Sequence, residues 1–186
     1  LHVMPEASLS VLANRYVDQI SIIQKISLQL PSNYKLYVKE HPAMIGYRNI
    51  NSYKRINKLP NVKLIDVNVD SNQILKMCSI VITITGTTGW EAILRGKPVL
   101  YLGNVFYSII SMSKKIENLN KLIYYINWAE KKFQFSKNEI LLFIKLIKKR
   151  SFKISYDFFW GITDFNTLKK LIFKKKDIII ISNILK

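Results

Sequence analysis

The feature that most constrains the fold of this chain is the segment at residues 81–103, which reads VITITGTTGWEAILRGKPVLYLG. Residues 81–84 are a largely β-branched apolar run of the kind found in buried parallel strands. A Gly/Thr turn follows, then a short stretch with helical spacing at 90–95 that ends at an Arg-Gly stop signal. A second buried run begins after a proline, at 98–102. This order of strand, turn, helix and strand predicts part of a parallel α/β sheet.

The rest of the first 110 residues repeats the alternation of strands and helices. Strands are expected at 1–3, 35–39, 61–65, 80–84 and 98–102, and helices at 16–30, 50–58, 72–78 and 90–95. Ser71 is the expected N-cap of the third helix. The alternation predicts an α/β fold class with a doubly wound, Rossmann-like, mostly parallel sheet.

After residue 110 the pattern changes. Further elements are expected as helices at 116–131, 137–150 and 168–175, and as a short strand or the end of a cut tail at 177–181. Ser136 and Glu139 form a capping box before the second of these helices. We therefore predict a Rossmann-like core at 1–110 and a helical carboxyl-terminal extension of the same domain at 111–186.

The composition is that of a globular domain, with 49% apolar and 12% aromatic residues in a chain of 186. No uncharged apolar window of about 18 residues occurs, and residues 1–8 do not resemble a signal peptide. The lone Cys78 cannot form an internal disulfide, which fits a reducing compartment. We predict a cytoplasmic location. The chain begins without Met and in mid-pattern, as if cut from a longer one.

The net charge of +17 permits several partners. A basic excess can serve nucleic acid, anionic lipid or an anionic substrate. It can also be compositional, since Ile, Lys and Asn are abundant, as an AT-rich genome produces. The lysines lie mostly within amphipathic helices rather than among aromatics, and no local nucleic-acid motif occurs. We therefore predict no nucleic-acid partner and leave open a peripheral contact with the inner face of the plasma membrane.

The turn formed by Gly86, Thr87, Thr88 and Gly89 is the first candidate binding site. Small side chains leave backbone N–H groups open, hydroxyls stand beside them, and the positive end of a helix dipole points at the same place. Thr87, Thr88 and the amide of Gly89 can therefore hold a phosphate or carboxylate. The turn matches neither the P-loop nor the dinucleotide fingerprint. The alternative is a tight strand–helix connection without a ligand.

The two residues that follow this turn, Trp90 and Glu91, each have a functional and a structural interpretation. Glu91 would lie in the first turn of the helix, where its carboxylate can accept hydrogen bonds from ribose hydroxyls. Its alternative role is a favourable interaction with the helix dipole. Trp90 is expected to pack in the core rather than to stack on a base.

The loops after the strands should meet at one edge of the sheet, because ligands of such sheets bind at the carboxyl ends of the strands. These loops include 4–10, 40–43 and 85–91. His41 is held there by Pro42 and can donate a hydrogen bond to a phosphate, although a lone histidine is often structural. We expect the three loops to converge.

The remaining polar residues of these loops suggest no metal centre. Glu6 is exposed by its neighbouring proline and is a candidate site residue, or else a capping or surface carboxylate. His41 has no Cys or His partner at metal-ligand spacing, and Asp66 and Asp70 read as loop residues. We predict no metal.

Three segments resemble bacterial capsular polysaccharide biosynthesis proteins, the family that includes β-Kdo transferases of the GT-B architecture. The segments are PEAS at 5–8 followed by YVDQ at 16–19, LYVKEHP at 36–42, and TGTTGWEAILRGKPVLYLG at 85–103, with Tyr107 just beyond. The resemblance covers about residues 1–110. It implies that the chain is the carboxyl-terminal, donor-binding half of a GT-B enzyme, with extra carboxyl-terminal helices, and that the amino-terminal half is missing here.

The resemblance also implies a glycosyltransferase that binds a nucleotide-activated sugar, with CMP-Kdo favoured, for capsular polysaccharide or lipopolysaccharide synthesis. His41-Pro42 and Thr87-Thr88 would contact the donor nucleotide and its phosphate. Many members have Ser where Thr87 or Gly86 stands, and Thr87 keeps the hydroxyl. With the residues reasoned above, the expected donor-binding set is Glu6, His41, Pro42, Gly86, Thr87, Thr88, Gly89 and Glu91.

For catalysis, the resemblance places the general base in the amino-terminal half, outside this chain, so that no catalytic base is assigned here. His41 would stabilise the charge that develops on the departing phosphate. The nucleotide sugar is a substrate, so no cofactor is expected, and the acceptor would be a glycan or glycolipid. Alternatives are a related GT-B transferase or epimerase with a UDP- or CDP-linked donor, and a non-catalytic module that binds a nucleotide or an anionic glycan.

Overall fold

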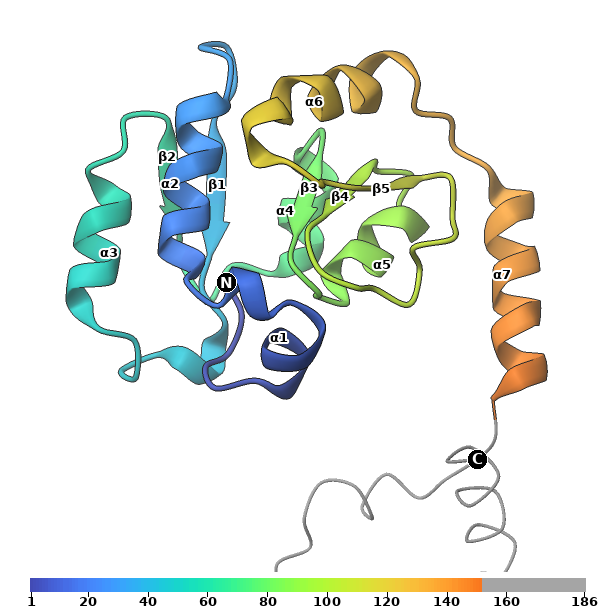
Figure 1. Ribbon diagram of the computed structural model, residues 1–186, viewed down its shortest axis with the longest axis horizontal. Coiled ribbons are helices and arrows are strands. Elements are labelled where there is room, and N and C mark those ends of the chain that lie inside the picture. The colour runs from blue at the N-terminus through green and yellow to red at the C-terminus, as the bar shows by residue number, and fades with distance from the viewer. Residues whose placement is uncertain (152–186) are drawn as a thin grey trace, which may run out of the picture. The chain divides into compact units, whose positions relative to one another are not determined.

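The computed structural model describes residues 1–151, apart from the side chains of Ala7 and Ser8. The elements expected at 168–175 and 177–181 lie outside the described residues. The chain divides into two compact units, Leu1–Leu141 and Leu142–Lys186. Every described strand belongs to the first unit (Figure 1). The domain boundary at residue 110 stays a prediction.

The described part of the chain alternates strands with helices, in the order shown in Figure 1. The strands are β1 (Leu36–Lys39), β2 (Val62–Ile65), β3 (Val81–Thr83), β4 (Val99–Tyr101) and β5 (Ser113–Lys115). The α-helices are α1 (Ala7–Leu12), α2 (Gln19–Gln29), α3 (Ile50–Asn57), α4 (Ser71–Met77), α5 (Thr88–Leu94), α6 (Leu122–Lys131) and α7 (Lys137–Arg150). Short 3-10 helices are η1 (Asn14–Tyr16), η2 (Pro42–Met44) and η3 (Leu119–Lys121).

All described strand pairs are parallel, which confirms the predicted α/β class. The strands form two sheets, β1-β2 and β3-β4-β5, where the alternation suggested a single sheet. Leu36 pairs with Val62 in the first sheet, and Val99 lies between Val81 and Ser113 in the second. Helix α3 packs on β2, and α5 packs on β3 and β4.

Three local expectations were wrong. Residues 1–3 are not a strand, although the Leu1 nitrogen donates to the Lys39 carbonyl at 2.5 Å beside the end of β1. The N-cap of α4 is Asp70, whose carboxylate accepts from the Asn72 amide at 3.0 Å, because Ser71 is already the first helical residue. Strand β5 lies where only helices were expected. Its Ser-Lys-Lys sequence has no apolar pattern, and its pairing with β4 defines it.

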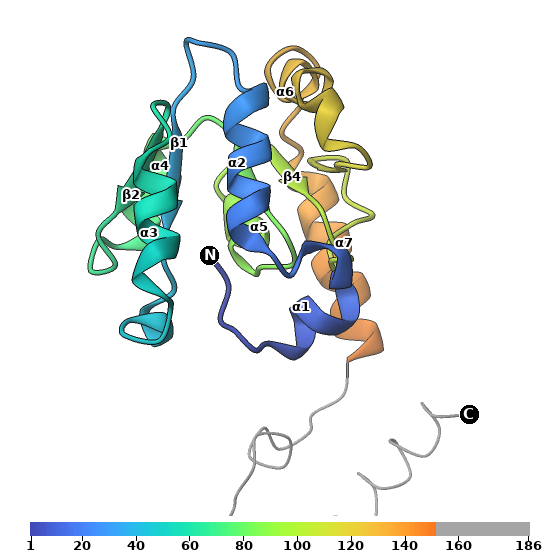
Figure 2. The ribbon, with the colours of Figure 1, turned by 60° about the vertical axis from the view of Figure 1, so that its left-hand side comes forward.

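Within residues 1–151, two clusters of buried side chains share helix α2. Ile22 and Ile26 face a cluster built around Leu100 on β4. Ile20 and Ile23 face a second cluster, which includes Val38 of β1 and Val62 of β2. Accordingly, Figure 2 shows α2 between the β1-β2 pair and β4. The helix thus joins the two sheets by burying isoleucines on both sides.

The capping box before α7 is partly confirmed. The Ser136 hydroxyl accepts from the Glu139 amide at 3.2 Å. The Glu139 carboxylate does not complete the box, because it accepts instead from the amide and hydroxyl of Ser111, at 2.6 and 2.5 Å. Within residues 1–151, no helix is both long and apolar enough to span a membrane.

Candidate functional site

The turn after β3 is held by hydrogen bonds to the backbone amide and the backbone carbonyl of Gly86. The Thr83 hydroxyl accepts from the Gly86 amide at 3.0 Å, and the Tyr107 hydroxyl donates to the Gly86 carbonyl at 2.9 Å. Tyr107 is 0% exposed, and burial raises the pKa of its phenol, so it remains a protonated donor. The backbone of the turn is therefore rigidly placed.

Both glycines of the turn are required by close packing. A Cβ added at Gly89 would lie 2.1 Å from the Tyr107 hydroxyl oxygen, and one at Gly86 would lie 2.8 Å from the Thr83 hydroxyl oxygen. Neither glycine has a positive φ. The glycines are explained by the structure alone, so they are weaker pointers to a ligand than the threonines between them.

The polar groups left open at the turn belong to Thr87 and Thr88. Both residues are exposed, and α5 begins at Thr88. Among the described residues, their amides donate to no protein acceptor. The Gly89 amide, expected to help hold an anion, already donates to the Gly86 carbonyl at 3.2 Å. An anion at this turn would therefore meet the hydroxyls and amides of the two threonines.

The residues that follow fit the predicted helix. Glu91 is half-buried in the first turn of α5, where a carboxylate interacts favourably with the helix dipole. Trp90 lies edge-to-face with Phe106, with ring centroids 5.9 Å apart. Trp90 thus packs against a neighbouring ring, as expected of a structural tryptophan.

His41 lies at the end of β1 with its ring exposed. Its Nδ1 accepts from the Ala43 amide at 3.1 Å, which caps η2, and Pro42 is the first residue of that short helix. Because Nδ1 is an acceptor, the neutral ring carries its hydrogen on Nε2. That N–H is available as a donor to a bound anion.

Glu40, which the sequence analysis left unassigned, is the centre of a buried polar network. It is 4% exposed and accepts from the His41 amide at 2.7 Å and the Tyr53 hydroxyl at 3.0 Å. It also forms an ion pair with Arg48, whose side chain is 9% exposed. Burial, and then the bond to Glu40, raise the pKa of Tyr53. A buried carboxylate satisfied in this way serves structure, and it fixes the loop that presents His41.

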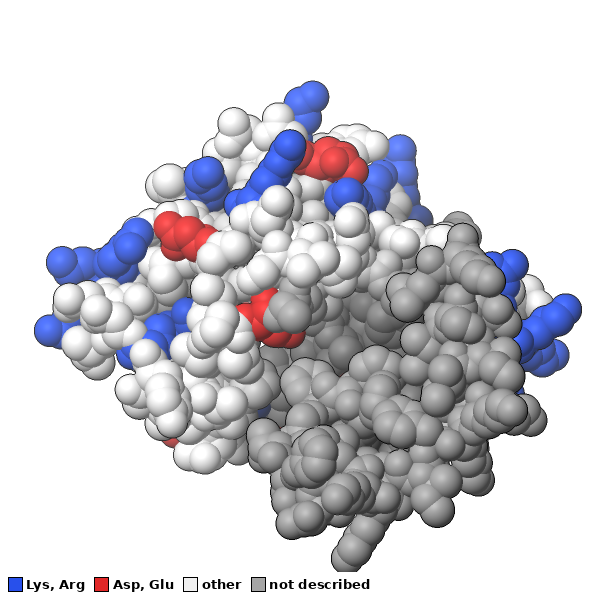
Figure 3. Space-filling model, turned by 60° about the horizontal axis from the view of Figure 1, so that its bottom comes forward, with Lys and Arg blue, Asp and Glu red and all other residues white. Residues whose placement is uncertain are grey.

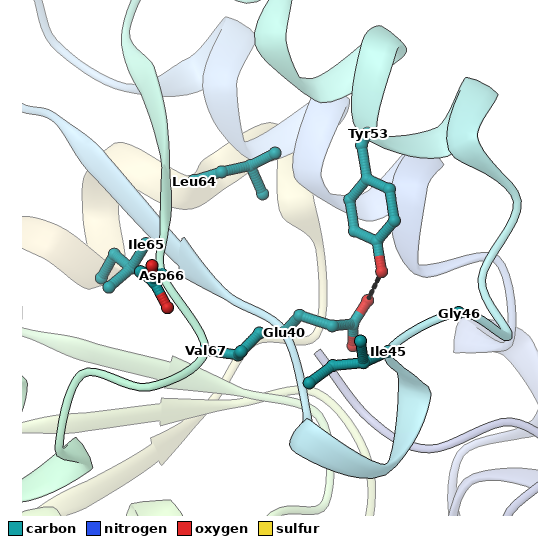
Figure 4. Close-up of a pocket in the computed structure, with 8 residues that line it drawn as sticks. All are labelled: Glu40, Ile45, Gly46, Tyr53, Leu64, Ile65, Asp66 and Val67. Atoms are coloured by element: carbon teal, nitrogen blue, oxygen red, sulfur yellow. Dashed lines mark hydrogen bonds between the residues drawn. The ribbon is translucent and has the colours of Figure 1, made fainter.

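A pocket of about 360 Å³ opens at the carboxyl ends of β1 and β2. Figure 4 shows the Tyr53 hydroxyl meeting the Glu40 carboxylate on one side of it and Asp66 on the other. The lining residues are Glu40, Ile45, Gly46, Tyr53, Leu64, Ile65, Asp66 and Val67. The volume lies within the usual range for small-molecule sites, about 300–1,000 Å³. Sequence reasoning missed this pocket because its walls come from separate segments.

The amino-terminal segment connects the other two loops. Glu6 precedes α1, and its Oε2 lies 3.2 Å from Nδ1 of His2. The His2 ring lies against Gly86 of the turn, and the His2 carbonyl accepts from Arg48 at 2.8 Å. His2 therefore contacts the turn at Gly86 and, through Arg48, the segment that follows η2. A shared ligand for the predicted site residues stays a prediction.

Figure 3 shows lysine and arginine side chains at several separate places on the described part of one face, with acidic side chains among them. No group of three or more potential metal-ligating side chains occurs within the described residues.

The fold and the site define a class: an α/β protein with parallel strands and candidate ligand contacts in the loops at their carboxyl ends. Residues 16–134 match the family model described as capsule polysaccharide biosynthesis protein. The chain therefore belongs to the capsule polysaccharide biosynthesis protein family.

A comparison with solved structures finds a chain described as Thermosulfurimonas dismutans KpsC, beta Kdo 2,4 transferase. The two are 22% identical, with a TM-score of 0.44, and the match covers 54% of this chain and 32% of that one. The present chain thus matches about a third of that protein's length. No curated protein sequence matches significantly.

Proposed function

We propose that this chain is a glycosyltransferase domain that binds a nucleotide-activated sugar for the synthesis of capsular polysaccharide or lipopolysaccharide. The main support is the family match over residues 16–134, a range that contains both His41-Pro42 and the turn at 85–91. In the structure these segments follow β1 and β3, at the ends of parallel strands where α/β proteins bind ligands.

The chemistry available at these loops suits transfer from a nucleotide sugar. The phosphate of the departing nucleotide gains negative charge as the glycosidic bond breaks. The Nε2–H of His41 and the hydroxyls and amides of Thr87 and Thr88 are donors that can stabilise this charge. Donors that bind the developing charge better than the ground state lower the barrier.

The favoured donor is CMP-Kdo, and the acceptor is a glycan or glycolipid. The support for this donor is the resemblance of residues 36–42 and 85–103 to the β-Kdo transferases of the family. In this proposal the domain works in the cytoplasm, at the inner face of the plasma membrane, where a positive net charge favours an anionic surface.

The test is nucleotide binding to the full chain, measured by isothermal titration calorimetry with CMP, UMP and UDP. We expect CMP to bind more tightly than UMP. His41→Ala and the double variant Thr87→Ala/Thr88→Ala should each weaken CMP binding about tenfold or more, because hydrogen bonds to charged groups contribute about 1.5–3 kcal/mol.

The matched control is Ser32→Ala, which removes an exposed hydroxyl from the loop before β1, at the opposite ends of the strands. It should leave CMP binding unchanged. A preference for UMP or UDP would contradict a CMP-linked donor and favour the alternative, a related enzyme with a UDP-linked donor. Salt-sensitive DNA binding without nucleotide binding would overturn the proposal.

A further inference from the structure

His2 is held in place by a buried polar framework that an ordinary loop residue does not require. Its amide donates to Oε1 of Gln19 at 2.7 Å, and its carbonyl accepts from Nε2 of Gln19 at 3.3 Å and from Arg48 at 2.8 Å. Gln19 is buried, and Arg48 is itself fixed by the ion pair to Glu40. These bonds fix the backbone of His2 and therefore the position of its Cβ.

The ring of His2 has one side on a carboxylate and the other on the turn. Its Nδ1 lies 3.2 Å from Oε2 of Glu6. The edge formed by Cε1 and Nε2 lies 3.5 and 3.7 Å from the position of a Cβ added at Gly86. Gly86 immediately precedes Thr87 and Thr88, whose amides and hydroxyls are open.

The surroundings of this imidazole keep it neutral and orient it. The bond to Glu6 places the ring hydrogen on Nδ1, so that Nε2 is left with a lone pair. Burial lowers the pKa of His2, against an opposing effect of Glu6 and with smaller lowering effects of the Leu1 amino group and His41. The side chain is only 13% exposed. In the described part of the chain, Nε2 has no protein hydrogen-bond partner.

We propose that His2, positioned by Glu6, is a phosphate-binding residue of the turn at Gly86–Thr88, which takes up a proton at Nε2 when a phosphate-bearing ligand arrives. The proton comes from solvent, and no covalent bond changes. The phosphate then accepts from Nε2–H, while Nδ1–H remains bonded to Glu6. This inference rests on the proposed function, since it names one more contact to the donor phosphate.

The physical reason is a change of charge around a poorly solvated ring. Without ligand, burial disfavours the imidazolium. An anion within about 4–6 Å favours the charged form, and the carboxylate of Glu6 shares the positive charge from the other side. His2 and His41 would then act differently, since His41 donates from a neutral ring, whereas His2 donates only after protonation.

The test follows the two histidines of the chain directly by ¹⁵N NMR, with His41→Gln used to assign the signals. A phosphomonoester itself titrates near pH 6, so a pH dependence of affinity would not show which group takes up the proton. The experiment therefore observes the His2 ring directly. Without ligand, we expect the tautomer of His2 with hydrogen on Nδ1. Saturating CMP at pH 7 should convert His2 to the imidazolium form. An Nε2–H tautomer, or a ring unchanged by bound CMP, would overturn the inference.

Variants give an independent measurement. His2→Gln should weaken CMP binding about tenfold at pH 6.5 and abolish the proton uptake measured by calorimetry in buffers of different ionisation enthalpy. Glu6→Gln should reduce proton uptake while the chain stays folded. Ser32→Ala again serves as the control and should bind CMP and take up protons as the wild type does.

Inorganic phosphate separates this inference from the proposed function. If inorganic phosphate converts His2 to the imidazolium form but no nucleotide binds, the inference stands and the proposed function fails. If CMP binds without affecting His2, the proposed function stands and the inference fails. If neither phosphate nor any of the three nucleotides binds, both are wrong.

Discussion

The two histidines show how strongly the surroundings of a single residue decide its chemistry. His41 is exposed, and a backbone amide donates to its Nδ1. His2 is largely buried, and its Nδ1 faces the carboxylate of Glu6. The neutral rings therefore carry their hydrogens on opposite nitrogens, so that only His41 can donate from Nε2 without a change of charge.

Tyr107→Phe tests whether the turn depends on one buried hydroxyl. The change removes one of the two donors to the Gly86 carbonyl, which keeps the hydrogen bond from the Gly89 amide. We expect the free energy of unfolding to fall by about 0.5–1.5 kcal/mol, measured by urea denaturation. Tyr37→Phe, at an exposed position on β1, is the matched control and should have little effect. Equal stability of the two variants would show that the hydrogen bond contributes nothing measurable.

The lowered pKa of His2 predicts a pH dependence of stability. Burial makes the folded chain bind fewer protons than the unfolded chain, in which His2 titrates near its ordinary value of 6.5. The contribution to the free energy of unfolding is therefore fully present above pH 6.5 and is lost as the pH falls toward the lower folded pKa. Urea denaturation between pH 7.5 and 5.5 measures this loss. His2→Gln should remove it, whereas His41→Gln should retain it; equal losses in both variants would contradict the prediction.

At the scale of elements, the loop after β1 is held by a buried ion pair rather than by a regular helix. Glu40 accepts hydrogen bonds from the His41 amide and from Tyr53 on α3, and it forms an ion pair with Arg48. Arg48 in turn donates a hydrogen bond to the His2 carbonyl and so holds the backbone of His2 in place. The carboxylate of Glu40 thus helps to place both the loop after β1 and the backbone of His2. It forms no hydrogen bond with Thr87 or Thr88.

Arg48→Met should destabilise the protein strongly, because it leaves Glu40 charged, buried and without its ionic partner. Removing one member of a buried pair costs about 3–5 kcal/mol, so we expect a loss of about 3 kcal/mol by urea denaturation. Arg55→Met, on α3, is the control, since Arg55 bonds only at the surface, to Gln24.

The double variant Glu40→Leu/Arg48→Met tests whether the unpaired charge of Glu40 causes the loss of stability. It should be more stable than Arg48→Met alone, because the unpaired charge is gone. A double variant that loses the sum of both single effects would show that packing, and not charge, dominates this loop.

At the scale of the whole described fold, helix α2 unites two small sheets that share no strand. Its isoleucines enter both buried clusters, and Asp18 caps its start by accepting from the Ser21 amide at 3.1 Å. The two-stranded β1-β2 sheet has too few strands to be stable by itself in water. We therefore expect the β1-β2 pair and the β3-β4-β5 sheet to unfold together.

Leu100→Ala measures how much the larger cluster contributes. Leu100 is fully buried on the central strand β4, and truncation of such a leucine costs about 2–5 kcal/mol through lost burial and the cavity that remains. Leu28→Ala on α2, where the leucine is 79% exposed, should change stability by less than about 0.5 kcal/mol. Circular dichroism and tryptophan fluorescence should report one coincident transition. Separate transitions would mean that the sheets unfold independently.

The amino-acid sequence by itself determined the α/β class, the positions of β1 to β4 and of the helices between them, and the loops after the strands. These follow from local patterns: apolar runs for buried strands, helical spacing, and Gly or Pro at the ends. Only the tertiary structure decided that there are two sheets, that residues 113–115 form a strand, and that Glu40 is buried.

Tertiary structure also decided that His2 lies on Gly86 and that a pocket opens beside Tyr53. Each of these features is a contact between residues far apart in the chain. Arg48 and His2, for example, are separated by 46 positions, and Tyr107 and Gly86 by 21. A local pattern shows which residues will be buried or will turn, but the partner that each meets depends on how the elements pack together.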